Sequence, residues 1–279
     1  MYDFPVRSRS LEPQTLRTSR HPATALSLTV LTICAVWACW AIKSATGADA
    51  AMLQGLNGFA HRWWTLDYAV VWLTNDGFQK GGILMLLLWW VWFKPGDSGR
   101  STREILICVA AAAPVALVVS RLISFAAPFQ ARPLYNPDLD VRLAYTLSPE
   151  VLIHWNSFPS DHAALFFTFV IGFFLISWRF GLLALVHVLV VVCFPRVFLG
   201  IHYPTDILAG AVLGAGIGAM ACLPTMRSVL ARPALAWMDR HPGPFYLCLF
   251  FYTYQMSNAL GWMRDIVVLV LHLARHQAS

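Results

Sequence analysis

Residues 23–42 read ATALSLTVLTICAVWACWAI, a run of twenty residues without one charged side chain. An α-helix needs about 20 mostly apolar residues to cross the ~30 Å hydrocarbon core of a bilayer, so the run predicts a transmembrane helix. It exceeds the ~7–15 residues of a signal-peptide core, and we therefore expect a retained anchor. The preceding residues, 1–22, carry four arginines and are expected to form a basic cytoplasmic tail.

The composition of the whole chain also indicates a membrane protein. Of its 279 residues, 58% are hydrophobic and only 12% are charged, about half of the ~25% that an average soluble domain carries. So little charge cannot cover a soluble globule of this length, which argues against a soluble enzyme and a disordered chain. The net charge of +6 is spread along the chain, so a nucleic-acid partner is not expected either. The expected partner is the lipid bilayer.

Further apolar runs predict the rest of the fold, an all-α polytopic membrane bundle of about six transmembrane helices. They lie within 66–93, 104–120, 163–177, 182–194 and 207–223. Polar residues at 75–77 and at Lys80 interrupt the first of these runs, so its uninterrupted apolar part is expected to begin near Gly81. Residues 245–273 start apolar and turn polar, which leaves open a seventh span, a hairpin or an interfacial helix. The expected parts are thus a tail (1–22), a membrane domain (23–223) and a C-terminal extension (224–279).

Basic residues predict the orientation, because lysine and arginine accumulate in short cytoplasmic loops. With the N-terminus inside and six spans, eleven basic residues fall on the cytoplasmic side and seven on the other. This bias predicts an integral membrane protein with a cytoplasmic N-terminus. The long loop 121–161 and the connection 195–206 then lie on the outer face of the membrane.

The arginines on that predicted outer face include Arg121, Arg132 and Arg196. An ionisable residue at a membrane boundary is costly unless it is paired or solvated, so it marks a functional site by default. The planar, permanently charged guanidinium suits phosphate oxygens better than an ammonium does. Together the three arginines predict an anion site.

Two helix starts border the same face. Ser160 precedes the run at 163–177 and is expected to cap that helix, whose free N–H groups form a ready anion site. Pro204 is expected to open the last span, with Asp206 in its first turn and His202 just before it. An aspartate on one imidazole nitrogen leaves the other nitrogen free as a nucleophile. Taken singly, Ser160 and Asp206 also fit plain helix capping.

The three blocks form a recognisable pattern: Arg132-Pro133, Pro159-Ser160-Asp161-His162 and RVFLGIHYPTD at 196–206. The pattern resembles the type 2 phosphatidic acid phosphatase superfamily of membrane lipid-phosphate phosphatases, over roughly 77–223 with a motif core at 121–206. Two positions depart from it. Phe125 stands where the family has a lysine, so Arg121 is expected to take over that role. Asp161 stands where the family commonly has a glycine, and this form of the motif resembles the undecaprenyl-diphosphatase-like branch. The Asp161 carboxylate is expected to turn away from the bound phosphate and to pair with an arginine.

The resemblance implies an integral membrane phosphatase that acts on a lipid phosphate or pyrophosphate, such as undecaprenyl pyrophosphate or phosphatidic acid, through a phosphohistidine. It implies His202 as the nucleophile, Asp206 as its partner and His162 as the proton donor. Phosphate binding is implied for five residues: Arg121, Arg132, Ser160, Asp161 and Arg196. Neither a metal nor another cofactor is implied.

Alternatives stay open at this point. A lipid phosphotransferase would use the same intermediate with a different acceptor. An anion or lipid transporter fits less well, because the strong polar residues cluster at one depth rather than recurring along the spans. A silent lipid-binding member fits less well too, because both histidines are present. The sequence does not indicate an oligomeric state.

Overall fold

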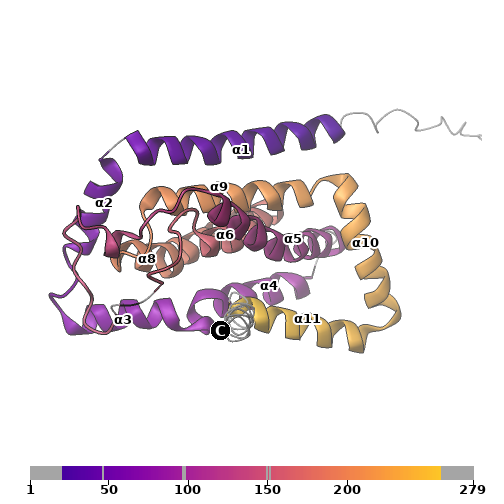
Figure 1. The fold of residues 1–279 in the computed structure, drawn as a ribbon. Coiled ribbons are helices and arrows are strands. Elements are labelled where there is room, and N and C mark those ends of the chain that lie inside the picture. Colours follow the sequence, from indigo (N-terminus) through magenta and orange to yellow (C-terminus); the bar gives the residue numbers. More distant parts are fainter. Residues whose placement is uncertain (1–20, 46, 96–98, 149, 151, 259–279) are drawn as a thin grey trace, which may run out of the picture.

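The computed structural model describes residues 21–45, 47–95, 99–148, 150 and 152–258. Within these ranges every regular element is a helix, which confirms the all-α class (Figure 1). Residues 1–20 of the predicted basic tail lie outside the described residues, and the last two, 21 and 22, belong to the first helix. In chain order the elements are α1 (His21–Ala45), α2 (Ala48–Asn57), α3 (Trp64–Asn75), the π-helix η1 (Phe78–Gly82), α4 (Ile83–Phe93), α5 (Gly99–Ala126), the short 3₁₀-helix η2 (Pro133–Tyr135), α6 (Asp161–Ile176), α7 (Trp178–His187), the π-helix η3 (Val188–Cys193), α8 (Phe194–Phe198), α9 (Pro204–Ala221), α10 (Pro224–Arg240) and α11 (Pro242–Ser257).

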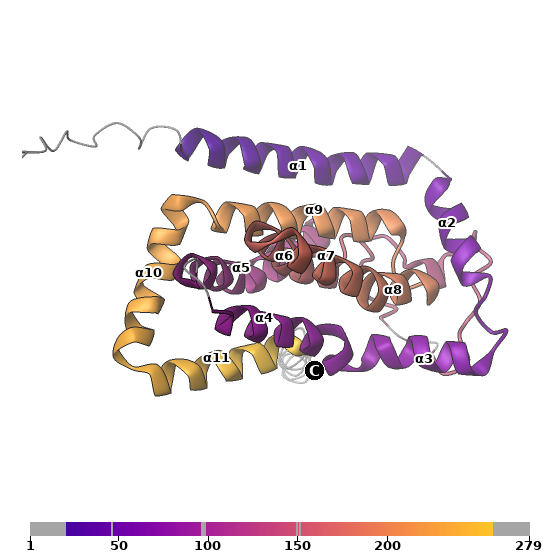
Figure 2. The ribbon, with the colours of Figure 1, turned by 180° about the vertical axis from the view of Figure 1, so that it is seen from behind.

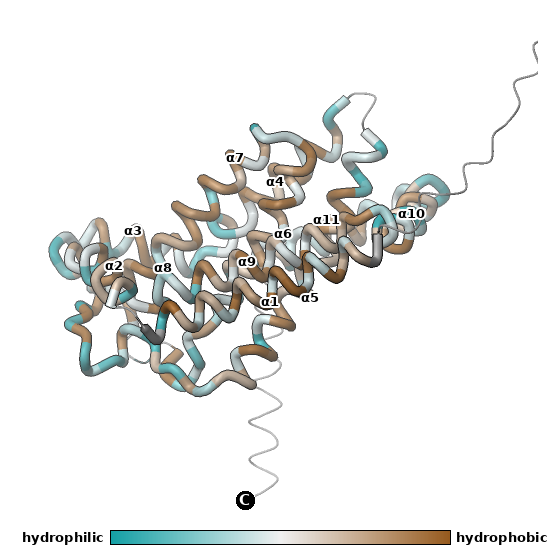
Figure 3. The backbone as a smooth tube through the Cα atoms, turned by 90° about the horizontal axis from the view of Figure 1, so that it is seen from above, coloured by the Kyte–Doolittle hydropathy of each residue, from teal (hydrophilic) through white to brown (hydrophobic). Residues whose placement is uncertain are grey.

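Each of the six predicted runs overlaps an apolar helix of the described chain. Four segments are long and apolar enough to cross a membrane: Ala23–Lys43, Gly99–Ala126, Trp178–Phe198 and Pro204–Ala221. Two shorter apolar helices, Phe78–Phe93 and Asp161–Ile176, accompany them. Hydrophobic residues predominate along the middle of the bundle, and hydrophilic residues gather mainly at its two ends (Figure 3). This distribution is that of an integral membrane protein, because the middle of a bilayer excludes exposed charge.

The helices form a layered bundle. α5, α6 and α9 pack together in the centre, and α1 packs along α9 on one side. On the other side, α4 and α11 pack against each other, and α10 crosses one end of the bundle (Figures 1 and 2). The end opposite α10 holds the N-termini of α6 and α9, and we call it the motif end.

The ambiguous segment 245–273 begins as part of α11, which packs on α4. The indole nitrogen Nε1 of Trp89 donates a hydrogen bond of 3.1 Å to Oγ1 of Thr253. Large apolar side chains cover the outward side of α11, and Leu247, Phe250 and Phe251 are 61–70% exposed. The helix is therefore part of the apolar bundle as far as Ser257, and the predicted region beyond 258 lies outside the described residues.

Close approach of α6 and α9 brings the motif blocks together. A Cβ atom on Gly210 would lie 2.2 Å from the carbonyl oxygen of Ser160, and one on Gly214 would lie 2.0 Å from that of Ala164. Small residues spaced four apart let helix backbones touch inside a membrane. As a result the two N-termini lie side by side, and the backbone N–H of Ser160 donates to the carbonyl of Asp206 at 2.9 Å.

Candidate active site

The N-terminus of α6 presents the second motif block. Ser160 has an extended backbone and caps the helix, and its Oγ accepts from the backbone N–H of Ala163 at 3.4 Å. This confirms the predicted cap. Asp161 and His162 occupy the first turn, as their position after the cap requires.

The N-terminus of α9 presents the third block. Pro204 is the first helical residue, and the Asp206 carboxylate reaches back to accept the backbone N–H of Tyr203 at 2.9 Å. This confirms the predicted start of the helix and its capping contact. The same oxygen, Oδ2, accepts the hydroxyl of Ser157 at 2.5 Å, and Oδ1 forms an ion pair with Lys43. Asp206 is fully buried, with 0% of its surface exposed.

His202 makes a different hydrogen bond from the one expected. Its Nδ1 lies 2.9 Å from the backbone carbonyl of Ser157, whereas Oδ2 of Asp206 is 3.7 Å away, longer than an ordinary hydrogen bond. The reason is that the Asp206 oxygens already accept from Ser157, Tyr203 and Lys43. A carbonyl only accepts, so Nδ1 carries the proton and the lone pair is on Nε2.

The lone pair of His202 faces a buried arginine. Nη1 of Arg132 lies 3.2 Å from Nε2 of His202 and donates to the carbonyl of Ile201 at 2.8 Å. Burial first, and then the charge of Arg132, lower the pKa of His202 to about 4, against the opposing effects of Asp206 and Asp161. The imidazole is therefore neutral at neutral pH, and its Nε2 carries a lone pair beside the Arg132 guanidinium.

Arg132 itself is held in the centre of the charged groups. Its Nη2 donates to the carbonyl of Asn156 at 3.3 Å, and its Nε is buried with no hydrogen-bond partner among the described residues. Burial lowers the pKa of Arg132 to about 10; Asp161 and Asp206 oppose this shift, and Arg121 and Arg196 add to it. The guanidinium thus remains charged at neutral pH, and a buried donor without an acceptor suits an incoming oxyanion.

The other two arginines border the same centre. Arg196 is 4% exposed, and its Nη1 donates to the carbonyl of Val192 at 3.0 Å, one turn earlier in the chain. Arg121 lies in the last two turns of α5, where its guanidinium stacks 4.8 Å above the Trp155 ring and pairs with Oδ2 of Asp161. Phe125, one turn further, is 73% exposed and faces out of the bundle.

Asp161 pairs with an arginine as expected, but its carboxylate stays inside the site. Oδ1 accepts both the backbone N–H of His162, at 2.8 Å, and the ring Nδ1 of His162, at 2.9 Å. The carboxylate therefore fixes the imidazole of His162 through Nδ1, and Nε2 takes no part in this contact. An Asp next to a His can do this because both lie in the first turn of α6, where the carboxylate is also stabilised by the helix dipole.

Two residues of the site were not predicted. Ser157 holds both His202, through its carbonyl, and Asp206, through its hydroxyl. Lys43 reaches Asp206 from the end of α1. The only signal for Lys43 in the sequence is that it is the first charge after a twenty-residue apolar run, and Ser157 has no signal beyond its closeness to the second block.

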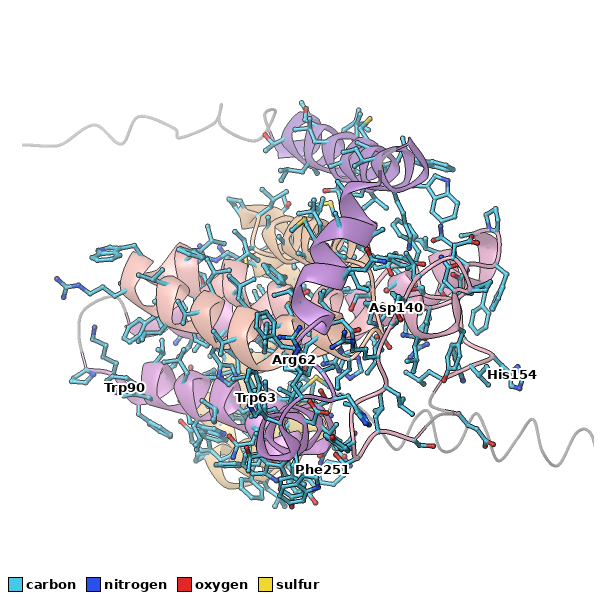
Figure 4. All side chains as sticks on the ribbon, turned by 90° about the vertical axis from the view of Figure 1, so that its left-hand side faces the viewer. Arg62, Trp63, Trp90, Asp140, His154 and Phe251 are labelled. Atoms are coloured by element: carbon cyan, nitrogen blue, oxygen red, sulfur yellow. The ribbon has the colours of Figure 1, made fainter. Side chains whose placement is uncertain are left out.

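His154, a polar residue of the motif end, stands apart from this centre. The exposed His154 projects away from the bundle in Figure 4, which looks onto this end.

Within the part of the chain that the structure describes, no three His, Cys, Asp or Glu side chains gather in a way that could hold a metal ion.

Comparisons with known proteins agree with the motifs. The family model of the PAP2 superfamily matches residues 103–228, a range that contains all eight predicted site residues. A protein of Escherichia coli (strain K12) named "Putative undecaprenyl-diphosphatase YbjG" is 30% identical over 153 residues, which are 54% of this chain and 69% of that protein. A Bacillus licheniformis protein named "Bacitracin transport permease protein BcrC" is 48% identical over 59 residues, which are 21% of this chain and 29% of that protein. No solved structure matches the chain significantly. The motif blocks, the helical bundle and these matches together place this integral membrane protein in the PAP2 superfamily.

Proposed function

We propose that this protein is a membrane phosphatase that hydrolyses a lipid phosphate or lipid pyrophosphate through a phosphohistidine. The observation that carries the proposal is the pairing of His202 with Arg132. A neutral imidazole has its proton committed to the Ser157 carbonyl, and its lone pair lies 3.2 Å from a buried guanidinium. Phosphoryl transfer depends chiefly on positioning and on neutralising charge, and this pair supplies both at one point.

In the proposed first step, Nε2 of His202 forms a bond to phosphorus as the bond from phosphorus to the leaving oxygen breaks. His162 gives a proton to that oxygen, and the product alcohol or lipid phosphate departs. In the second step water attacks the phosphohistidine, His162 takes the proton of the water, and the N–P bond breaks to return its electron pair to Nε2. The net reaction consumes one water and releases inorganic phosphate.

The three arginines take the role of binding the non-bridging oxygens. Arg121, Arg132 and Arg196 carry fixed positive charge against the developing negative charge, as the N-terminus of α6 does through Ser160. Asp161 fixes the imidazole of His162 and thereby the direction of proton transfer. With this charge supplied by side chains, the proposed reaction is independent of metal ions.

We assign the site to the outer face of the membrane, because the basic residues are more numerous on the opposite side of the predicted topology. The Escherichia coli relative favours a bacterial inner membrane, in which this is the periplasmic face. Undecaprenyl pyrophosphate is the favoured substrate. The E. coli relative carries a name that refers to it, and Asp161 matches the form of the motif that resembles that branch. A lipid phosphate such as phosphatidic acid offers the same reacting group, so it belongs in the same test.

The test is phosphate release by the purified protein in detergent, with EDTA present. The substrates are undecaprenyl pyrophosphate, phosphatidic acid, phosphatidylglycerol phosphate and lipid A phosphates. Release from at least one of them is expected, highest with undecaprenyl pyrophosphate, and abolition by EDTA would contradict metal independence. His202→Ala should lose turnover, whereas His241→Ala, on the exposed residue between α10 and α11, should keep it. Turnover by His202→Ala would remove the proposed nucleophile.

The phosphotransferase alternative is separated in the same assay by adding an acceptor. Acid-labile phosphate on His202 is expected from a substrate labelled in its terminal phosphate. If an added lipid or sugar alcohol gains that label while little free phosphate appears, the protein is a transferase and not a hydrolase.

A further inference from the structure

Lys43 is a buried lysine that reaches the centre of the site from outside the motif blocks. Its side chain is 4% exposed and forms an ion pair with the fully buried Asp206. The ammonium lies 4.1 Å from the centroid of the Tyr203 ring and 5.8 Å from that of Phe158. Lysine is almost never buried this completely unless it is paired, because removal of its charge from water is costly. The Asp206 carboxylate and the two aromatic rings therefore take the place of water around the Lys43 ammonium.

The helix that carries Lys43 is set on α9 in one register. α1 and α9 run antiparallel (Figure 1), and a Cβ on Gly216 would lie 2.2 Å from Oγ1 of Thr32. Farther along, Oγ1 of Thr29 lies 3.1 Å from the sulfur of Met220. These contacts near the other end of α9 fix how far α1 extends, and so they place Lys43 beside Asp206. The stretch matched by the family model, 103–228, does not include α1.

The ion pair determines what the Asp206 carboxylate can do. Oδ1 is held by Lys43, so Oδ2 is directed to the Ser157 hydroxyl and the Tyr203 N–H and stays 3.7 Å from Nδ1 of His202. Without the ammonium, the carboxylate would be free to rotate and to compete with the Ser157 carbonyl for the Nδ1 proton. Its charge would also be uncompensated next to the nucleophile.

We propose that Lys43 is a positioning residue of the active site, which orients the Asp206 carboxylate and balances its charge next to His202. This inference rests on the proposed function. It makes α1 a part of the catalytic unit, since the site has its full set of charges only when α1 is docked. The charged groups that face His202 are then Asp206 from α9, Arg132 from the loop before η2 and Asp161 from α6, with Lys43 acting through Asp206.

The first test compares Lys43→Met with Lys43→Arg by steady-state kinetics on the best lipid substrate. Lys43→Met is expected to lower kcat at least tenfold and to change KM less than threefold, because the buried Lys43 is proposed to act through Asp206 and not on the substrate. Lys43→Arg should recover at least a third of the lost kcat, since it restores the charge. Lys94→Met is the matched control: Lys94 stacks on Phe180 at 5.0 Å but is exposed at the other end of the bundle. A kcat within twofold of the parent for Lys43→Met, or no recovery with Lys43→Arg, overturns the inference.

The pH profile separates positioning from loss of packing. In Lys43→Met the uncompensated Asp206 carboxylate favours the imidazolium form, so the acid limb of kcat/KM should move up by at least half a pH unit. A packing defect alone would lower kcat/KM at every pH without that displacement, and a profile of unchanged shape would count against Lys43 as a positioning residue.

A thermal-stability cycle tests the pair without relying on activity. Lys43→Met and Asp206→Asn each leave one buried charge unpaired, and the double variant leaves none, so its loss of Tm should be clearly smaller than the sum of the two single losses. Additive losses would show that the two side chains are not coupled and would overturn the inference. If the parent protein releases no phosphate from any lipid while the cycle is non-additive, the proposed function fails and the placement of Asp206 by Lys43 stands.

Discussion

The contact between Gly210 and Ser160 links helix packing to catalysis, and Gly210→Ala tests it. An added methyl carbon would lie 2.2 Å from the Ser160 carbonyl oxygen, and Cβ atoms essentially never come closer than 3.0 Å to another atom. α6 and α9 must therefore separate locally by roughly 0.8 Å, a shift that acts directly on the hydrogen bond between Ser160 and Asp206. His162 moves with α6 and His202 stays with α9.

The expected effect follows from that displacement. A misplacement of about 1 Å costs on the order of 10²-fold in rate, and an overpacked site costs about 1–3 kcal/mol in stability. Gly210→Ala should thus lower kcat/KM by about 10²-fold in the phosphate-release assay and lower Tm in detergent. Gly55→Ala is the control, because a Cβ there has no neighbour within 4 Å. If Gly210→Ala keeps kcat/KM within threefold of the parent, the close approach of α6 and α9 does not set the catalytic geometry.

Three further predictions concern the environment of His202. Burial and the charge of Arg132 hold the pKa of His202 at about 4. We therefore expect kcat/KM to stay level from pH 7 to 5 and to decrease only near pH 4. A decrease near the ordinary histidine pKa of ~6.5 would show that the imidazole is not shielded. Because the unfolded chain takes up this proton at the higher pH, His202 should also lower the stability of the fold as the pH falls from about 6.5 toward 4, which thermal melts against pH will measure. Ser157→Ala keeps the backbone carbonyl that accepts from His202 but removes the hydroxyl that donates to Asp206. A hydrogen bond to a charged group contributes about 1.5–3 kcal/mol, so kcat should fall roughly 10- to 150-fold. An unchanged kcat would assign that hydroxyl to structure alone.

Features set by neighbouring residues could be predicted from the sequence. The apolar runs gave the spans because run length alone matches bilayer thickness, and Ser160 and Pro204 gave the two helix starts because capping depends on the first turn. The ion pair between Lys43 and Asp206 could not be predicted in this way, because it depends on the register of α1 against α9, which are distant in the sequence. The hydrogen bond of His202 to the Ser157 carbonyl was missed for a related reason. It forms because the oxygens of Asp206 are already occupied, and that requires all of their partners to be known.

The pairing of Lys43 with Asp206 also bears on how the protein is made. Lys43 lies in the last turn of α1, and Asp206 lies in the first turn of α9. During synthesis Lys43 is therefore inserted well before Asp206. Until Asp206 follows, the ammonium of Lys43 remains at the water-facing boundary of the membrane, where it is solvated. Only when α9 has been inserted can the two charges leave water together. A nascent chain that stops short of α9 is expected to be inactive, so unfinished copies carry no half-assembled catalyst.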